Sequence, residues 1–265
     1  MTELKQQLKG GLFVSSMMGV TDGAFCARTL KGRHGLAMVQ TGAYLAEPTA
    51  TDEDKGASAR CFLPPDPEAC AAFLAADCRD IQEVADVVIC MNLATPKLEW
   101  GLEAATCFAQ AGGDAVELNV HGGYGRYLEQ GKLRAMVLPE HQDELLRWVA
   151  AFVQLDMPLI VKYDGSSERA DLVAALRRMA NLPVLGVHVN VRDAETKRPN
   201  VELVRALRGL IPGLLLASGY VRSAEDSQAL FDAGADMVGA AAPLREDAGY
   251  LGRIAAGLGK KAPQV

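Results

Sequence analysis

The sequence lacks several features that would place it in a class of protein at once. It has no run of about 18–20 apolar residues, the length that a membrane-spanning helix needs. Residues 1–10 are polar and lack the apolar centre of a signal peptide, so we expect a cytoplasmic protein. The six cysteines are scattered, with neither a C-x-x-C pair nor a Cys/His ligand spacing. This pattern predicts reduced thiols and no metal site.

Common nucleotide-binding motifs are also missing. The chain contains neither a G-x-G-x-x-G fingerprint nor a P-loop. Its formal net charge of -6 argues against a broad phosphate-binding surface, because affinity for nucleic acids depends on clustered Lys and Arg. We therefore expect a small-molecule partner, and neither DNA nor a membrane.

Short apolar segments alternate with segments of helical periodicity along the whole chain. The eight predicted strands are 11–16, 36–40, 87–91, 115–120, 158–163, 184–190, 214–218 and 235–238. Such alternation indicates a parallel sheet covered by helices, and eight units of this length favour closure. We predict an α/β protein, a single (β/α)8 TIM barrel over residues 1–265. A polar insertion around 46–66 interrupts the repeat, as a solvated loop or as a lid.

Polar residues stand at the predicted strand ends, where the active sites of such barrels lie. The fourth strand ends in Asn119, followed by His121 and a glycine-rich loop. Lys162 lies inside an apolar strand, where an amine needs an anionic partner or a lowered pKa. Two interpretations stay open for Lys162: a functional group in the barrel mouth, or a structural partner of Glu117 or Asp164.

His188 lies in the next strand and is either a second site residue or a hydrogen-bonded core histidine. Small residues end the last two strands, in the runs Ala217-Ser218-Gly219 and Val238-Gly239-Ala240. Small residues before helix N-termini at these two positions are typical of a phosphate site. We therefore expect a ligand that carries phosphate, either a cofactor or a substrate.

The order and spacing of these motifs resemble the flavin-dependent barrels of the dihydrouridine synthase and dihydroorotate dehydrogenase group. The matching segments are 15–22 (SSMMGVTD), 117–120 (ELNV), 161–162 (VK), 187–188 (VH), 218–219 (SG) and 234–239 (GADMVG). The resemblance implies FMN as the cofactor. The predicted cofactor-binding residues, taken from the resemblance and from the strand ends, are Met17, Met18, Gly19, Asn92, Lys162, His188, Ser218, Gly219, Gly239 and Ala240. The resemblance also implies that Asn119 faces flavin and substrate.

The chain departs from the family pattern at several positions. The synthases place a catalytic Cys in an Asn-x-Gly-Cys-Pro pattern, where residues 119–123 here read Asn-Val-His-Gly-Gly. Asn92 replaces the Gln of their third strand, and Ala240 replaces their Arg beside the phosphate. The sequence ends after the eighth predicted helix, without the helical tRNA-binding domain of the synthases. We therefore do not expect tRNA as the substrate.

These observations predict an FMN-dependent oxidoreductase acting on a small reduced N-heterocycle, such as a pyrimidine or a pterin. The predicted catalytic residues are His121, as general acid or base, Lys162 and Asn119. The segment from Glu53 to Pro67 and His121 resemble a subgroup from organisms that make methanopterin-type coenzymes, which suggests a role in such biosynthesis. One alternative is a flavin-free lyase, aldolase or isomerase that uses Lys162 on a phosphorylated substrate. The other is a non-catalytic barrel that binds a ligand or a partner, and a homodimer is the one assembly we consider.

Overall fold

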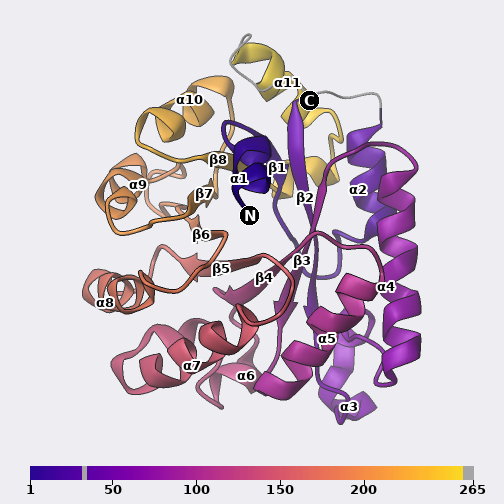
Figure 1. The fold of residues 1–265 in the computed structure, drawn as a ribbon. Coiled ribbons are helices and arrows are strands. Elements are labelled where there is room, and N and C mark those ends of the chain that lie inside the picture. The colour runs from indigo at the N-terminus through magenta and orange to yellow at the C-terminus, as the bar shows by residue number, and fades with distance from the viewer. Residues whose placement is uncertain (32–34, 259–265) are drawn as a thin grey trace.

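A computed structural model describes residues 1–31 and 35–258. Within these residues, eight parallel strands form a closed barrel in the order of the sequence (Figure 1). The strands are β1 (Leu12–Val14), β2 (Leu36–Leu45), β3 (Val88–Ala94), β4 (Ala115–Val120), β5 (Leu159–Asp164), β6 (Gly186–Asn190), β7 (Leu214–Ser218) and β8 (Met237–Ala240). The predicted (β/α)8 barrel is confirmed.

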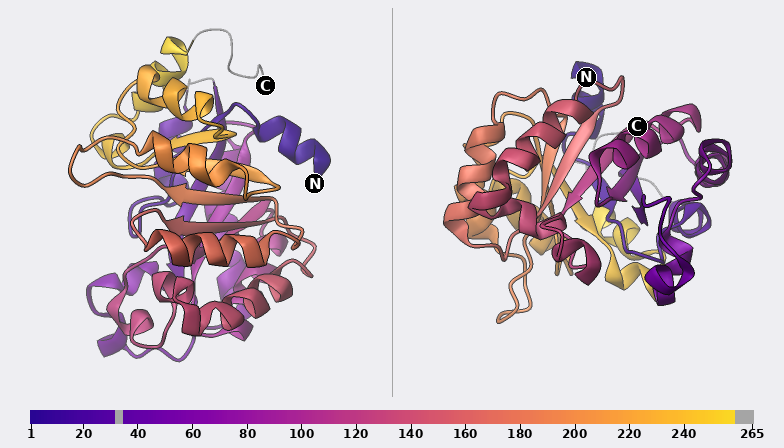
Figure 2. Two further views of the ribbon diagram at one scale, coloured as in Figure 1. Left: turned by 90° about the vertical axis from the view of Figure 1, so that its left-hand side faces the viewer. Right: turned by 90° about the horizontal axis from the view of Figure 1, so that it is seen from below.

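Helices lie outside the strands and cover the barrel (Figures 1 and 2). They are α2 (Gly23–Leu30), α4 (Pro67–Gln82), α5 (Leu98–Gln110), α7 (Gln142–Phe152), α8 (Arg169–Met179), α9 (Val201–Arg208), α10 (Ala224–Asp232) and α11 (Tyr250–Gly257). Short polar side chains start several of them. Asp22 caps α2 by accepting a hydrogen bond from the Phe25 amide at 2.8 Å, and Asp66 caps α4 through the Ala69 amide at 2.9 Å.

An additional helix, α1 (Thr2–Leu8), closes the N-terminal end of the barrel. Leu8 is completely buried in a cluster with Ala37, Val88 and Ala115, which stand at the starts of their strands. In Figure 2, α1 lies beyond one end of the strands. The sequence did not predict this helix, because residues 1–10 are mostly polar and only Leu4 and Leu8 pack against the apolar cluster.

The predicted insertion around 46–66 folds back on the barrel instead of standing free in solvent. It contains α3 (Asp52–Lys55) and the 3-10 turn η1 (Gly56–Cys61). Arg126, in the short helix α6 (Gly125–Leu128), forms an ion pair with Glu47 at 2.6 Å and another with Asp54. Three further 3-10 turns complete the loops: η2 (Leu133–Val137), η3 (Pro139–His141) and η4 (Ala242–Arg245).

The barrel interior changes from apolar to polar along the strands. Side chains alternate between the two faces of each strand, so every second residue points inward. Near the N-terminal end the inward residues include Phe13, Met38, Ile160 and Leu216, all completely buried. Toward the C-terminal end a buried polar layer follows, formed by Gln40, Asn92, Glu117, Lys162, His188 and Ser218.

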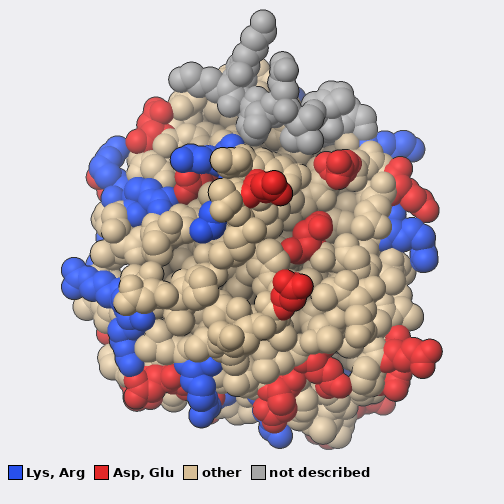
Figure 3. Space-filling view, viewed as in Figure 1, with Lys and Arg blue, Asp and Glu red and all other residues tan. Residues whose placement is uncertain are grey.

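The surface does not concentrate charge of one sign on the face seen in Figure 3, where Lys and Arg are interspersed with Asp and Glu. None of the helices in the described part of the chain has the length and apolar character needed to cross a membrane. Over residues 1–31 and 35–258, no group of three His, Cys, Asp or Glu side chains is placed to hold a metal ion.

Candidate active site

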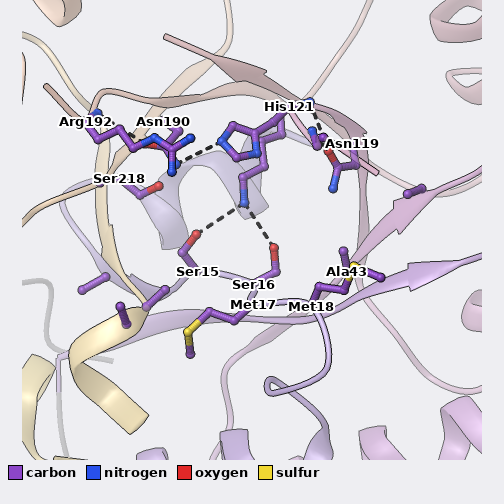
Figure 4. Close-up of a pocket in the computed structure, with 18 of the residues that line it drawn as sticks. Ser15, Ser16, Met17, Met18, Ala43, Asn119, His121, Asn190, Arg192 and Ser218 are labelled. Carbon is purple, nitrogen blue, oxygen red and sulfur yellow. Dashed lines mark hydrogen bonds between the residues drawn. The ribbon is translucent and has the colours of Figure 1, made fainter. Parts of the chain in front are cut away.

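A cavity of about 560 Å³ opens at the C-terminal ends of the strands (Figure 4). Ligand pockets generally have volumes of about 300–1,000 Å³, so this cavity can hold a cofactor-sized molecule. Of the residues predicted from the sequence, it is lined by Met17, Met18, Asn119, His121, Lys162, Ser218, Gly219 and Ala240. The fold therefore brings together residues from five different strand ends.

Four predicted cofactor-binding residues do not line this cavity. Asn92 and His188 are completely buried in the polar layer beneath it. Gly239 faces the Phe13 ring, with ring carbons 2.5 Å from the position a Cβ would occupy. Gly19 faces the Arg60 side chain at a separate surface depression. Depth along the strand explains the positions of Asn92 and His188, because a polar residue inside a strand can stop one layer short of the cavity.

Glu117 is the centre of the polar layer and makes four contacts across the barrel. Its Oε1 accepts a hydrogen bond from Asn92 Nδ2 at 2.5 Å and lies 3.4 Å from Lys162 Nζ. Its Oε2 accepts a hydrogen bond from Gln40 Nε2 at 2.6 Å and lies 2.7 Å from His188 Nδ1. The sequence suggested Glu117 only as a structural partner of Lys162. Its contacts with four side chains depend on the strand register, which the sequence does not reveal.

The charge state of this layer follows from its contacts. Burial alone would raise the pKa of Glu117, but Lys162, His188 and the hydrogen bonds outweigh it and bring the pKa to about 2. Burial lowers the pKa of His188, with Glu117 acting in the opposite direction and Lys162 in the same direction. At neutral pH the layer therefore contains an ionised Glu117 and a neutral His188.

Lys162 belongs both to the polar layer and to the cavity. Its Nζ donates hydrogen bonds to Ser16 Oγ at 3.1 Å and Ser15 Oγ at 3.5 Å (Figure 4), besides its ion pair with Glu117. Its ion pair is thus with Glu117, whereas Asp164 accepts hydrogen bonds from Ser166. Both interpretations of Lys162 are thus combined: it pairs with Glu117 and also lines the site.

Asn119 shapes the loop that follows β4. Its Oδ1 accepts hydrogen bonds from the amides of His121 at 3.0 Å and Gly122 at 2.7 Å, and its Nδ2 donates to Asn92 Oδ1 at 2.9 Å. An amide group carries two N–H donors, so one remains available to a ligand.

His121 lines the cavity and is held by Asn190, whose Nδ2 lies 3.1 Å from Nε2 of the ring. As the amide nitrogen is a donor, Nε2 accepts and the proton stands on Nδ1. Burial, together with the charge of Lys162, lowers the pKa of His121 to about 3. A ring with this pKa has no imidazolium proton to give at neutral pH. The role predicted for His121 is general acid or base, and this geometry suits a hydrogen-bonding ring better than a proton donor.

The rim after β6 and β7 combines close backbone approach with positive charge. Gly219 has φ +111°, and a Cβ there would lie 2.8 Å from the Arg192 amide nitrogen, so only glycine fits without strain. Arg192 and Arg222 line the same cavity, and the sequence analysis missed both. Each follows a predicted strand by a few residues, a position that could have singled them out in an acidic chain.

Neither the known protein-family models nor the curated proteins searched match this sequence. Function therefore has to be inferred from the chemistry of the site.

Proposed function

We propose that this protein is an FMN-dependent oxidoreductase that acts on a small reduced N-heterocycle. The observation that carries the proposal is the continuity of the cavity, which reaches both Lys162 of the polar layer and Arg222 of the rim. A ligand with a polar ring at one end and a phosphate at the other complements these two ends. FMN has this form, and so do other phosphorylated ring compounds.

The donors along the cavity fit FMN. The ring of a flavin presents carbonyl and nitrogen acceptors, which suit the Lys162 ammonium and the free N–H of Asn119. Its phosphate suits Arg192, Arg222 and the backbone at Gly219, because guanidinium groups bind phosphate oxygens in pairs. When bound, FMN would supply hydride transfer.

The chain itself would contribute orientation and exclusion of water. Glu117 and Ser16 hold the Lys162 amine in place, so that it can donate to a fixed acceptor on the ligand. The apolar side chains of Met17 and Leu133 line the same cavity and reduce contact of the ring with water.

The flavin-free alternative receives less support from the geometry of Lys162. A Schiff base requires a neutral amine with a free lone pair. Here the amine lies 3.4 Å from the buried Glu117 carboxylate and donates to two serine hydroxyls. This arrangement suits an ammonium that orients a ligand better than a nucleophile.

Titration with FMN and riboflavin, followed by flavin fluorescence and by the visible spectrum after gel filtration, tests the proposal. We expect FMN to bind more tightly than riboflavin, which lacks the phosphate. Replacing Arg222 with Met should lower the ratio of the FMN affinity to the riboflavin affinity roughly 10- to 100-fold. This is the effect of losing a hydrogen bond to a charged group, which contributes about 1.5–3 kcal/mol. Arg205→Met is the matched control, because Arg205 is exposed and pairs with Glu202 on α9. A protein that retains neither flavin would refute the proposal.

A further inference from the structure

Three side chains form a row from the barrel interior to the cavity. Glu117 Oε2 lies 2.7 Å from His188 Nδ1, and His188 Nε2 lies 2.7 Å from Ser218 Oγ. The three residues come from β4, β6 and β7, so the row crosses the polar layer. Only Ser218 reaches the cavity, where Figure 4 shows it near Asn190.

The protons in this row can be placed from its contacts. The ionised Glu117 can only accept, so the neutral His188 ring carries its proton on Nδ1 and donates it to Oε2. Nε2 is then an acceptor, and the Ser218 hydroxyl donates to it. The donor of Ser218 is consumed in this way, which makes the hydroxyl poorly suited to the phosphate contact predicted from the sequence. Its oxygen lone pairs remain for chemistry in the cavity.

The surroundings hold the row in position. His188 is completely buried, and the Phe13 ring meets it edge-on with 5.1 Å between ring centroids. Strand register places Lys162 beside His188, and the Lys162 ammonium lines the same cavity as Ser218. A fixed cation in a partly dry site stabilises negative charge that develops on a ligand oxygen.

We propose that Ser218 is a nucleophile for acyl transfer, with His188 as its general base and Glu117 as the residue that positions His188. This activity goes beyond the proposed redox function and needs no flavin. A carboxylate, an imidazole and a hydroxyl in this order are the arrangement that activates serine in hydrolases on unrelated folds. The ligand class is a small ester that fits the cavity.

The transfer conserves atoms and protons. Ser218 Oγ bonds to the carbonyl carbon of the ester while its proton moves to His188 Nε2. The C–O bond of the ester then breaks, and the leaving alkoxide takes that proton from Nε2. Water repeats the sequence on the acyl-serine: its oxygen bonds to the carbonyl carbon as it gives a proton to Nε2. The bond between that carbon and Ser218 Oγ then breaks, and Oγ takes the proton back from Nε2. The products are one carboxylic acid and one alcohol.

The experiment treats the flavin-free full-length protein with p-nitrophenyl acetate and, separately, with methanesulfonyl fluoride. We expect a burst of p-nitrophenol and one covalent adduct, located on Ser218 by mass spectrometry of peptides. Ser218→Ala should abolish both, whereas Ser166→Ala should not, because the Ser166 hydroxyl donates its hydrogen bond to the Asp164 carboxylate. His188→Gln should slow acylation by at least about 100-fold, the usual contribution of a general base.

Circular dichroism would verify that each variant is folded. If His188→Gln does not fold, modification of Ser218 in the wild-type protein still decides between the alternatives. Absence of any adduct on Ser218 with both reagents, or an unchanged rate in a folded His188→Gln protein, would overturn the proposal. Because no FMN is present, neither result affects the test of flavin binding.

Discussion

Replacing Glu117 with Gln tests the central electrostatic feature of the barrel. The substitution preserves the volume of the side chain but removes its charge and turns one acceptor into a donor. Each oxygen of Glu117 faces two donors, so the new amide NH₂ group must face donors wherever it points. The Lys162 ammonium would also lose its carboxylate partner inside the barrel.

The expected loss of stability can be calculated in two ways. Removing one partner of a buried ion pair typically costs about 3–5 kcal/mol. The shift in the pKa of Glu117, from 4.5 to about 2, corresponds to roughly 3.5 kcal/mol at about 1.4 kcal/mol for each pKa unit. For a chain of this size, 3–5 kcal/mol lowers the melting temperature by roughly 6–20 °C.

The pH dependence of the stability difference shows whether the charge of Glu117 is its cause. Folding lowers the pKa of Glu117, so its contribution is fully present above the unfolded value of 4.5 and is lost as pH falls toward 2. Urea unfolding of wild-type and Glu117→Gln protein between pH 7 and pH 3 should therefore show a difference that shrinks below pH 4.5. Glu144→Gln is the control, because the Lys132–Glu144 pair is partly exposed and should contribute at most about 1 kcal/mol.

Two results would refute this reasoning. One is a Glu117→Gln protein within about 1 kcal/mol of the wild type at pH 7, which would mean that the buried contacts contribute far less than an ordinary buried ion pair. The other is a large difference that stays constant from pH 7 to pH 3, because a loss of packing does not titrate.

Two further predictions concern the loop after β4. Because the pKa of His121 is lowered to about 3, its ring should stay neutral from pH 8 to pH 5. The nitrogen chemical shifts of the imidazole report its protonation state. A titration of these shifts near pH 6.5 would contradict the prediction. Replacing Arg126 with Met leaves the buried Glu47 carboxylate without its 2.6 Å partner, so we expect a loss of roughly 1–3 kcal/mol and faster proteolysis within residues 46–61. Arg178→Met, which breaks an exposed pair with Asp143, should change the stability by less than about 1 kcal/mol. Equal effects of the two arginine variants would show that residues 46–61 are not held by Arg126.

The fold was largely predictable because eight apolar segments alternate with helical periodicity. The same alternation indicated Lys162 and Asn119, because a polar side chain inside an apolar strand needs a polar partner or a ligand in the barrel interior. What the sequence could not specify is how deep below the cavity each polar side chain lies in the barrel. His188 and Asn92 occupy strands in the same manner as Lys162, yet they stop in the layer below the cavity. Depth depends on strand stagger and on loop conformation, which form only when the barrel closes.

Contacts between distant segments were likewise beyond prediction. Glu117 meets Gln40 across 77 residues of sequence, and nothing near either residue indicates the pairing. Arg222 reaches the cavity because the backbone turns at Gly219 and Tyr220, both of which have positive φ. Such turns are set by tertiary packing as much as by local preference.

Glu117 contacts both Lys162 and His188, and this couples the two ends of the polar layer thermodynamically. Lys162 is one of the causes that hold the pKa of His188 low, so an anionic ligand that neutralises Lys162 would make His188 more basic. His188 would then withdraw the Ser218 proton more readily. Linkage is reciprocal, and a proton on His188 would strengthen the binding of that same anion. Occupancy at one end of the cavity thereby adjusts reactivity at the other without any movement of the backbone.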